Sequence, residues 1–87
     1  MSQKKIVIYS KDWCSYSWRA KRLLKRKGYE FEVIDATGNE ELRAWLAEAT
    51  GRQTVPQIFI DDSPIGGYDD IKALDRSGEL DRLVRSA

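Results

Sequence analysis

The sequence contains a single cysteine, Cys14, and no histidine. One cysteine cannot form an intramolecular disulfide, which argues against a small secreted domain held together by disulfides. Without histidine, the chain can build neither a His/Cys zinc site nor the Cys–His or Ser–His pairs that activate many nucleophiles. Few side chains remain that react at neutral pH, and Cys14 is the foremost of them.

Long hydrophobic runs and a large excess of either charge are also missing. The longest apolar stretch, from Ile6 to Tyr9, has about four residues, far fewer than the roughly 20 that cross a membrane. No apolar signal region follows the basic start of the chain, so we expect neither a secretory signal nor an anchor. The 15 basic and 14 acidic side chains leave a formal net charge of +1, unlike the strongly basic domains that bind nucleic acids. We therefore expect a cytoplasmic protein without a nucleic-acid or membrane partner.

The length of 87 residues fits one domain, spanning residues 1–87. Hydrophobic residues at 41% and charged residues at 33% are typical of a globular chain. The hydrophobic pattern alternates between strand-like and helix-like segments. Strands are predicted at 4–10, 29–35, 57–60 and, at an edge, 64–66. Helices are predicted at 15–27 and 39–50, from an Asp69 or Asp70 cap through Leu74, and as a final turn or two near residues 80–84.

This order, β-α-β-α-β-β-α, predicts an α/β fold. The first two strands should be parallel, because a helix joins them in a right-handed crossover. The last two should be antiparallel, because their connection is short. We predict a four-stranded mixed sheet flanked by helices on both faces.

Cys14 lies between the first predicted strand and the first predicted helix. A helix start offers unpaired N–H groups and the positive end of the helix dipole, and both stabilise a thiolate. Lys11 lies upstream, and the helix is rich in basic side chains that we interpret mainly as a solvated face. These surroundings predict a lowered pKa for Cys14. Because a sulfur of low pKa is a good leaving group, the pattern indicates a cysteine that cycles through a mixed disulfide.

Three short segments follow one another on this β/α pattern: Trp-Cys-Ser-Tyr-Ser at 13–17, Thr-Val-Pro at 54–56 and Gly-Gly-Tyr-Asp-Asp at 66–70. Together they resemble the glutaredoxin family of the thioredoxin superfamily, with the closest likeness to small bacterial glutaredoxins. The similarity extends over about residues 4–83. It implies a thioredoxin-like fold and a glutathione-dependent thiol–disulfide oxidoreductase.

The resemblance also implies roles for individual residues. Cys14 corresponds to the nucleophile, Tyr16 to the aromatic side chain of the glutathione groove, and Pro56 to the family's cis-proline. The other positions implied to bind glutathione are Lys11, Arg52, Gln53, Thr54, Val55, Gly67, Asp69 and Asp70. The active-site motif is completed by Trp13, Ser15 and Ser17.

Three positions depart from the bacterial pattern. Ser17 replaces the resolving cysteine of dithiol relatives, Ser15 replaces a proline, and Tyr68 stands where many relatives have a further cysteine. Ser17 removes the intramolecular disulfide step, which implies a monothiol mechanism that reduces glutathione mixed disulfides through Cys14. The pattern fits both a natural monothiol protein and a variant from which two cysteines have been removed.

The implied partners are glutathione, as co-substrate, and glutathionylated proteins or small disulfides. We expect a monomer and no metal ligand within the chain. An alternative function is a [2Fe–2S] carrier, in which Cys14 from each of two chains and two glutathione thiolates bind the cluster. A third is an inactive glutathione-binding module, in which Cys14 has an ordinary pKa.

Overall fold

A computed structural model describes residues 3–11 and 14–85. Within these residues, one sheet contains four strands: β1 (Ile6–Ser10), β2 (Glu32–Asp35), β3 (Gln57–Ile60) and β4 (Ser63–Gly66). Their order across the sheet is β2-β1-β3-β4. β1 is parallel to β2 and antiparallel to β3, and β3 is antiparallel to β4. The predicted mixed sheet is therefore confirmed.

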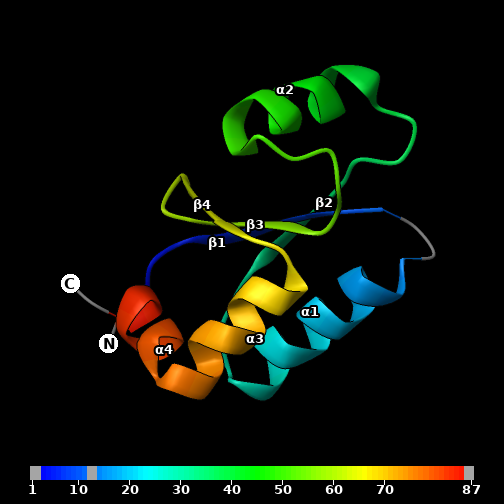
Figure 1. The fold of residues 1–87 in the computed structure, drawn as a ribbon. Helices are drawn as coiled ribbons and strands as arrows, with labels where there is room; N and C mark the ends of the chain where they lie inside the picture. The colour runs from blue at the N-terminus through cyan, green and yellow to red at the C-terminus, as the bar shows by residue number, and fades with distance from the viewer. Residues whose placement is uncertain (1–2, 12–13, 86–87) are drawn as a thin grey trace.

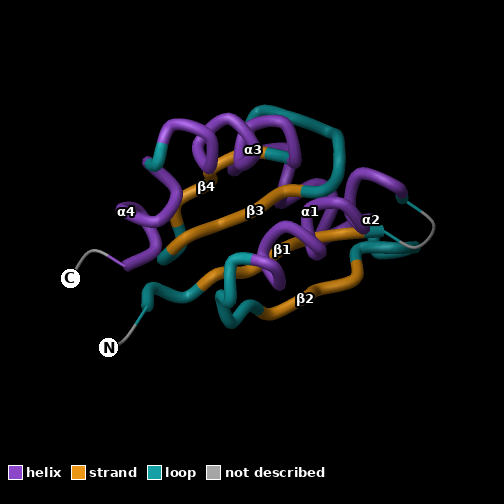
Figure 2. Tube along the Cα trace, turned by 90° about the horizontal axis from the view of Figure 1, so that it is seen from below, coloured by secondary structure: helices purple, strands orange, loops and turns teal. Residues whose placement is uncertain are grey.

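Four helices are described: α1 (Ser15–Arg26), α2 (Glu40–Thr50), α3 (Tyr68–Ser77) and α4 (Glu79–Arg85). Figure 1 shows α2 on one face of the sheet and the other three helices on the opposite face. Figure 2 shows the strands side by side, with β2 and β4 at the two edges. In the part of the chain that the structure describes, no helix is long and apolar enough to cross a membrane.

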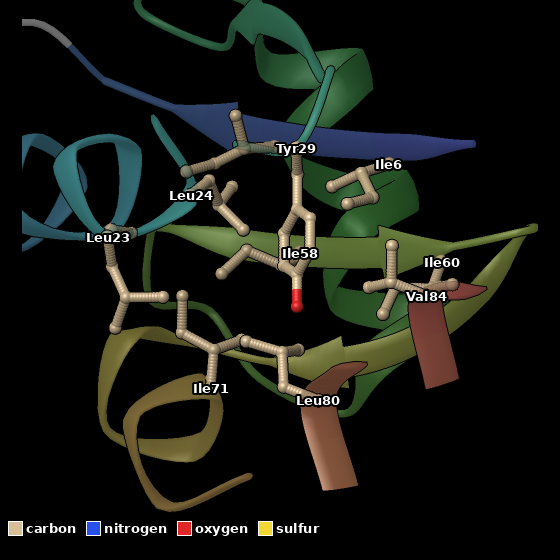
Figure 3. Packing of buried hydrophobic residues seen from close by; sticks show 11 residues of the cluster. Ile6, Leu23, Leu24, Tyr29, Ile58, Ile60, Ile71, Leu80 and Val84 are labelled. Atoms are coloured by element: carbon tan, nitrogen blue, oxygen red, sulfur yellow. The ribbon is translucent and has the colours of Figure 1, made fainter. Parts of the chain in front are cut away.

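The larger hydrophobic core lies between the sheet and α1, α3 and α4 (Figure 3). Ile58 and Ile60 of β3 point into it, whereas Phe59 belongs to the smaller core under α2. This alternation follows from the two-residue period of a strand. Since both faces of β3 are covered, all four of its residues are buried. A central strand fixed in this way holds the loop before it, residues 51–56, at one end of the sheet.

Several predicted boundaries are wrong. β1 begins at Ile6 rather than at residue 4, α1 ends at Arg26 rather than at residue 27, and β4 begins at Ser63 rather than at residue 64. β2 begins at Glu32 rather than at residue 29. Tyr29 instead donates its backbone N–H to Leu24 O at 3.2 Å, so this residue lies in the turn that closes the C-terminal end of α1. The N-cap of α3 is Gly67 rather than Asp69 or Asp70. Asp70 lies inside the first turn, where its carboxylate accepts the Gly67 N–H at 2.9 Å, as an acidic third residue of a helix commonly does.

Candidate active site

Cys14 is the N-cap residue of α1, with extended backbone angles, φ −94° and ψ 115°. Its carbonyl oxygen accepts the first helical hydrogen bond, from Trp18 N at 3.1 Å. No side chain caps this helix start. The backbone N–H groups of the first turn therefore remain available to the sulfur.

The pKa of Cys14 is lowered below the ordinary value of a thiol, as predicted. Partial burial of the sulfur raises the pKa, but hydrogen bonds that favour the thiolate outweigh this effect. They come from the Ser17 hydroxyl and from the backbone N–H groups of Ser17 and Tyr16, and the charge of Lys11 adds to them. Ser17 is only 1% exposed. Its hydroxyl has no hydrogen-bond partner among the described residues, so it is available to donate to the thiolate when Cys14 ionises.

The loop before β3 approaches the sulfur from the other side. The Val55–Pro56 peptide bond is cis, as predicted. The Cys14 thiol donates to the Val55 carbonyl oxygen, with 3.8 Å between sulfur and oxygen. The buried side chain of Gln57 supports this loop, because its Nε2 donates to Thr54 O at 2.8 Å.

An ion pair joins this loop to the start of α3. Arg52 Nη1 lies 2.7 Å from Asp70 Oδ2, the same oxygen that accepts the Gly67 N–H. The hydrogen bonds from Arg52 and Gly67 hold the pKa of Asp70 below its usual range, although desolvation opposes them. Gly66, with φ +127°, brings the chain so close to Asp70 that a Cβ at this position would collide with the carboxylate.

These elements enclose an open groove of about 300 Å³ beside the cysteine. Its lining comes from the first turn of α1, the cis-proline loop and the start of α3: Tyr16, Arg52, Thr54, Val55, Pro56, Gly67, Tyr68, Asp69 and Asp70. The structure thus brings together eight positions that the sequence implied for binding, although they lie far apart along the chain.

The family model for glutaredoxin matches residues 6–65. A glutaredoxin of Pseudomonas aeruginosa is 52% identical over 79 residues, which cover 91% of this chain and 94% of that protein. The chain belongs to the glutaredoxin family. Glutaredoxin 3 of Escherichia coli K12 is 48% identical over 80 residues, covering 92% of this chain and 96% of the relative.

Solved glutaredoxin structures confirm the thioredoxin-like fold. The solution structure of glutaredoxin from Brucella melitensis is 48% identical, with a TM-score of 0.88, and the match covers 99% of this chain and 94% of that one. A crystal structure of a buckwheat glutaredoxin–glutathione complex is 32% identical, with a TM-score of 0.84, and the match covers 91% and 74% of the two chains. Membership of the family supports a thiol–disulfide oxidoreductase activity in general.

Five predicted site residues of this glutaredoxin, among the described ones, are not part of the groove lining. Two of them, Cys14 and Ser17, form the reactive centre beside the groove, and the other three are Lys11, Gln53 and Ser15. Lys11 is exposed and acts on Cys14 through its charge. Gln53 lines a neighbouring hollow against α2, and Ser15 is exposed on the first turn of α1. Trp13 lies outside the described residues.

Two residues of the site were missed from the sequence. Tyr68 lines the groove, and its ring centroid lies 6.2 Å from that of Tyr16. Tyr68 directly precedes Asp69 and Asp70, two residues implied to bind glutathione, and this neighbourhood could have predicted that it lines the groove. Gln57 supports the loop, but a polar residue at the start of a strand is ordinarily solvated, and its burial follows only from the helices that cover both faces of β3.

Proposed function

We propose that this protein reduces glutathione mixed disulfides by a monothiol mechanism through Cys14. The observation that carries the proposal is the position of the Cys14 sulfur. It lies at a helix start that lowers its pKa, next to a groove lined by all but two of the predicted glutathione-binding residues. As the only cysteine of the sequence, Cys14 has no thiol partner within the chain.

The reaction has two exchange steps. The Cys14 thiolate attacks the glutathione sulfur of a mixed disulfide, the new bond joins Cys14 to glutathione, and the substrate thiolate leaves and takes a proton from water. A second glutathione thiolate then attacks the glutathione sulfur of this adduct. Glutathione disulfide leaves, and Cys14 returns as thiolate. Each mixed disulfide thus consumes one free glutathione, which supplies the reducing equivalents, and yields the substrate thiol and one glutathione disulfide.

The charges around the groove suit the two ends of glutathione. The Arg52 guanidinium is a partner for the glycine carboxylate, and the Asp70 carboxylate is a partner for the γ-glutamyl ammonium group. In the structure these two side chains pair with each other at 2.7 Å. The Arg52 side chain is 51% exposed and that of Asp70 is 39% exposed, so water weakens the pair and a zwitterionic ligand can replace it with its own charges. The exposed ring of Tyr16 covers the side of the groove next to Cys14.

Intact-mass spectrometry tests the proposal. The protein is mixed with a glutathionylated peptide and then with excess reduced glutathione. We expect Cys14 to gain one glutathione and then to lose it, both faster than a free cysteine peptide does. Cys14→Ser should gain none. An adduct that forms no faster than on the free peptide would remove the oxidoreductase assignment.

No contact among the described residues favours the alternative, a cluster shared by two chains, over thiol exchange. It predicts visible absorbance when the protein is purified without oxygen in the presence of glutathione. A cytoplasmic location, where glutathione keeps thiols reduced, forms part of the proposed function.

A further inference from the structure

A second groove lies between α1 and α3, outside the site described above. Its volume is about 350 Å³. Arg19, Arg22 and Arg26 line it from one face of α1, and Lys72 lines it from α3. Lys21 and Lys25 of the same helix are not part of its lining. The basic side chains of α1 therefore do not form one uniform solvated face, because a subset of them converges on this groove.

The cations of the groove lack acidic partners. Among the described residues, none of the four forms an ion pair, whereas Lys27, at the end of α1, pairs with Asp75 at 2.8 Å. Asp69 is the one acidic side chain in the lining. Four positive charges beside a single negative charge leave the groove with a local excess that the whole chain, at net +1, does not have. This local excess of positive charge favours an anionic ligand.

Aromatic rings hold several of these cations in place. The Arg22 guanidinium lies 5.3 Å from the Trp18 ring centroid, that of Arg19 lies 5.7 Å from Tyr16, and Lys72 Nζ lies 5.9 Å from Tyr68. Contacts of this kind orient the cation over the face of the ring and leave its N–H groups free to donate. The side chains are thus partly ordered before a ligand arrives, which lowers the entropy cost of binding.

The groove adjoins the active-site groove. Tyr16, Tyr68 and Asp69 line both of them, so the paired rings form the wall between them. A polypeptide that presents a modified cysteine to Cys14 and crosses this wall enters the basic groove.

We propose that the groove between α1 and α3 docks an acidic segment adjoining the modified cysteine of a protein substrate. This proposal rests on the proposed function and adds a class of preferred substrate. The arginines offer paired N–H groups that match carboxylates. A long nucleic acid is a poorer fit, because the opposite face carries the acidic first turn of α2, Glu40 and Glu41, and the overall charge is balanced.

The test compares three peptides that differ only beside one glutathionylated cysteine, where they carry three Glu, three Gln or three Lys residues. The readout is the ratio of second-order rate constants for deglutathionylation, Glu peptide over Gln peptide. Each exposed ion pair is worth about twofold, so three pairs predict a ratio of roughly five to ten at low ionic strength. The ratio should approach one at about 0.5 M salt, where screening is strong. The Lys peptide should be slower than the Gln peptide.

Arg22→Glu should lower this ratio at least threefold, and Lys72→Glu should also lower it. The matched control is Arg43→Glu, the same change of charge at an exposed arginine of α2 on the opposite face, and it should leave the ratio unchanged. A wild-type ratio near one, or equal losses in Arg22→Glu and Arg43→Glu, would overturn the proposal.

Direct binding separates this proposal from the proposed function. Titration with the unmodified Glu peptide needs no chemistry at Cys14 and should show binding that Arg22→Glu weakens. Slow turnover of all peptides together with such binding would reject the oxidoreductase alone. Absence of binding, or tighter Arg22-dependent binding of a single-stranded oligonucleotide at the same salt, would reject the acidic-peptide assignment.

Discussion

At the scale of single residues, Ser17 is a buried serine next to the reactive cysteine. Its hydroxyl has no hydrogen-bond partner among the described residues. A buried hydroxyl without a partner normally costs stability. The same group stabilises the thiolate once Cys14 ionises. Ser17 thus places a hydrogen-bond donor where dithiol relatives carry a second nucleophile.

Ser17→Ala should raise the pKa of Cys14, because it removes the hydroxyl that donates to the thiolate. The free energy of unfolding should stay within about 1 kcal/mol of wild type or rise, since a poorly satisfied polar group is removed. Attack by Cys14 should change little, because a more basic thiolate is a better nucleophile, whereas release of the Cys14 adduct by glutathione should slow severalfold.

The measurement is the ultraviolet absorbance of the thiolate as a function of pH. Ser15→Ala, a change of the same size at an exposed position of the same turn, should keep the pKa of wild type. If Ser17→Ala left the pKa of Cys14 unchanged, the backbone N–H groups and the charge of Lys11 would be enough to lower it without the hydroxyl.

At this scale, the sequence predicted the reactive residue but not all of its surroundings. The absence of every other cysteine and of histidine singled out Cys14, and its place before a helix gave the direction of its pKa. Tyr68 was noted only as a replaced cysteine. The position of Tyr68 in the groove depends on how closely α3 approaches α1, and the sequence around Tyr68 does not predict that distance.

At the scale of elements, the sequence pattern predicted those helix and strand ends that depend on residues nearby in the chain. The boundaries of β3 were confirmed, because a short apolar run between Pro56 and two aspartates admits one strand. Asn39, the first residue of the second predicted helix, is the N-cap of α2, and its side chain accepts the Leu42 N–H at 3.0 Å. The start of α3 was predicted less well. Gly67 carries no capping side chain, and the geometry there is set by Asp70, which reaches back to Gly67 and across to Arg52.

Gly66→Ala should disturb the start of α3. The added Cβ would collide with the Asp70 carboxylate, and the φ of +127° is unfavourable for alanine. We expect a loss of about 2–3 kcal/mol in the free energy of unfolding, measured by urea denaturation. Gly38→Ala is the matched control, with φ +71° but no atom within 4 Å of its Cβ, and should lose only about 1 kcal/mol. Equal losses would mean that backbone strain alone matters at Gly66.

Asp70→Asn should weaken glutathione binding more than it weakens the fold. The ion pair with Arg52 is exposed and contributes less than about 1 kcal/mol to stability. Loss of a charged partner for the ligand ammonium should raise the KM for glutathione about tenfold. Steady-state kinetics with a fixed glutathionylated peptide measure this change. Asp62→Asn, the same loss of charge in the β3–β4 turn, should leave the KM at its wild-type value. If the KM of Asp62→Asn rose as much as that of Asp70→Asn, the overall charge of the protein, and not contact of Asp70 with the ligand, would explain the change.

At the scale of the whole molecule, chemistry and stability are placed at opposite ends. The active-site groove lies at the end of the sheet where α1 and α3 begin, and α4 packs at the other end (Figure 1). A polar cluster fixes α4 there. Lys27 pairs with Asp75 and Asp81, and the Tyr29 hydroxyl donates to Asp81. Changes in this cluster should alter stability without altering exchange at Cys14.

Tyr29→Phe provides the test, because its effect should depend on pH in a defined way. The hydrogen bond from Tyr29, with help from Lys27 and Arg85, outweighs desolvation and lowers the pKa of Asp81. Because the pKa of Asp81 is lower in the folded protein, its carboxylate stabilises the fold at any pH above its unfolded pKa of about 4. This stabilisation is lost as the pH falls through the pKa of Asp81 in the folded protein. Burial, followed by the bond to Asp81, raises the pKa of Tyr29 to about 12. That stabilisation is complete below the unfolded pKa of about 10 and is lost as pH rises toward the folded value.

Wild type should therefore exceed Tyr29→Phe in free energy of unfolding by about 1 kcal/mol at pH 7. The difference should narrow at both pH extremes. Urea denaturation across the pH range measures it, with Tyr16→Phe, at a tyrosine that is 50% exposed, as a control that should show no such profile. A difference that stays constant with pH would mean that the ring of Tyr29 matters only through its packing. Mixed-disulfide exchange at pH 7 should match wild type in Tyr29→Phe, because the cluster lies at the end of the sheet away from Cys14.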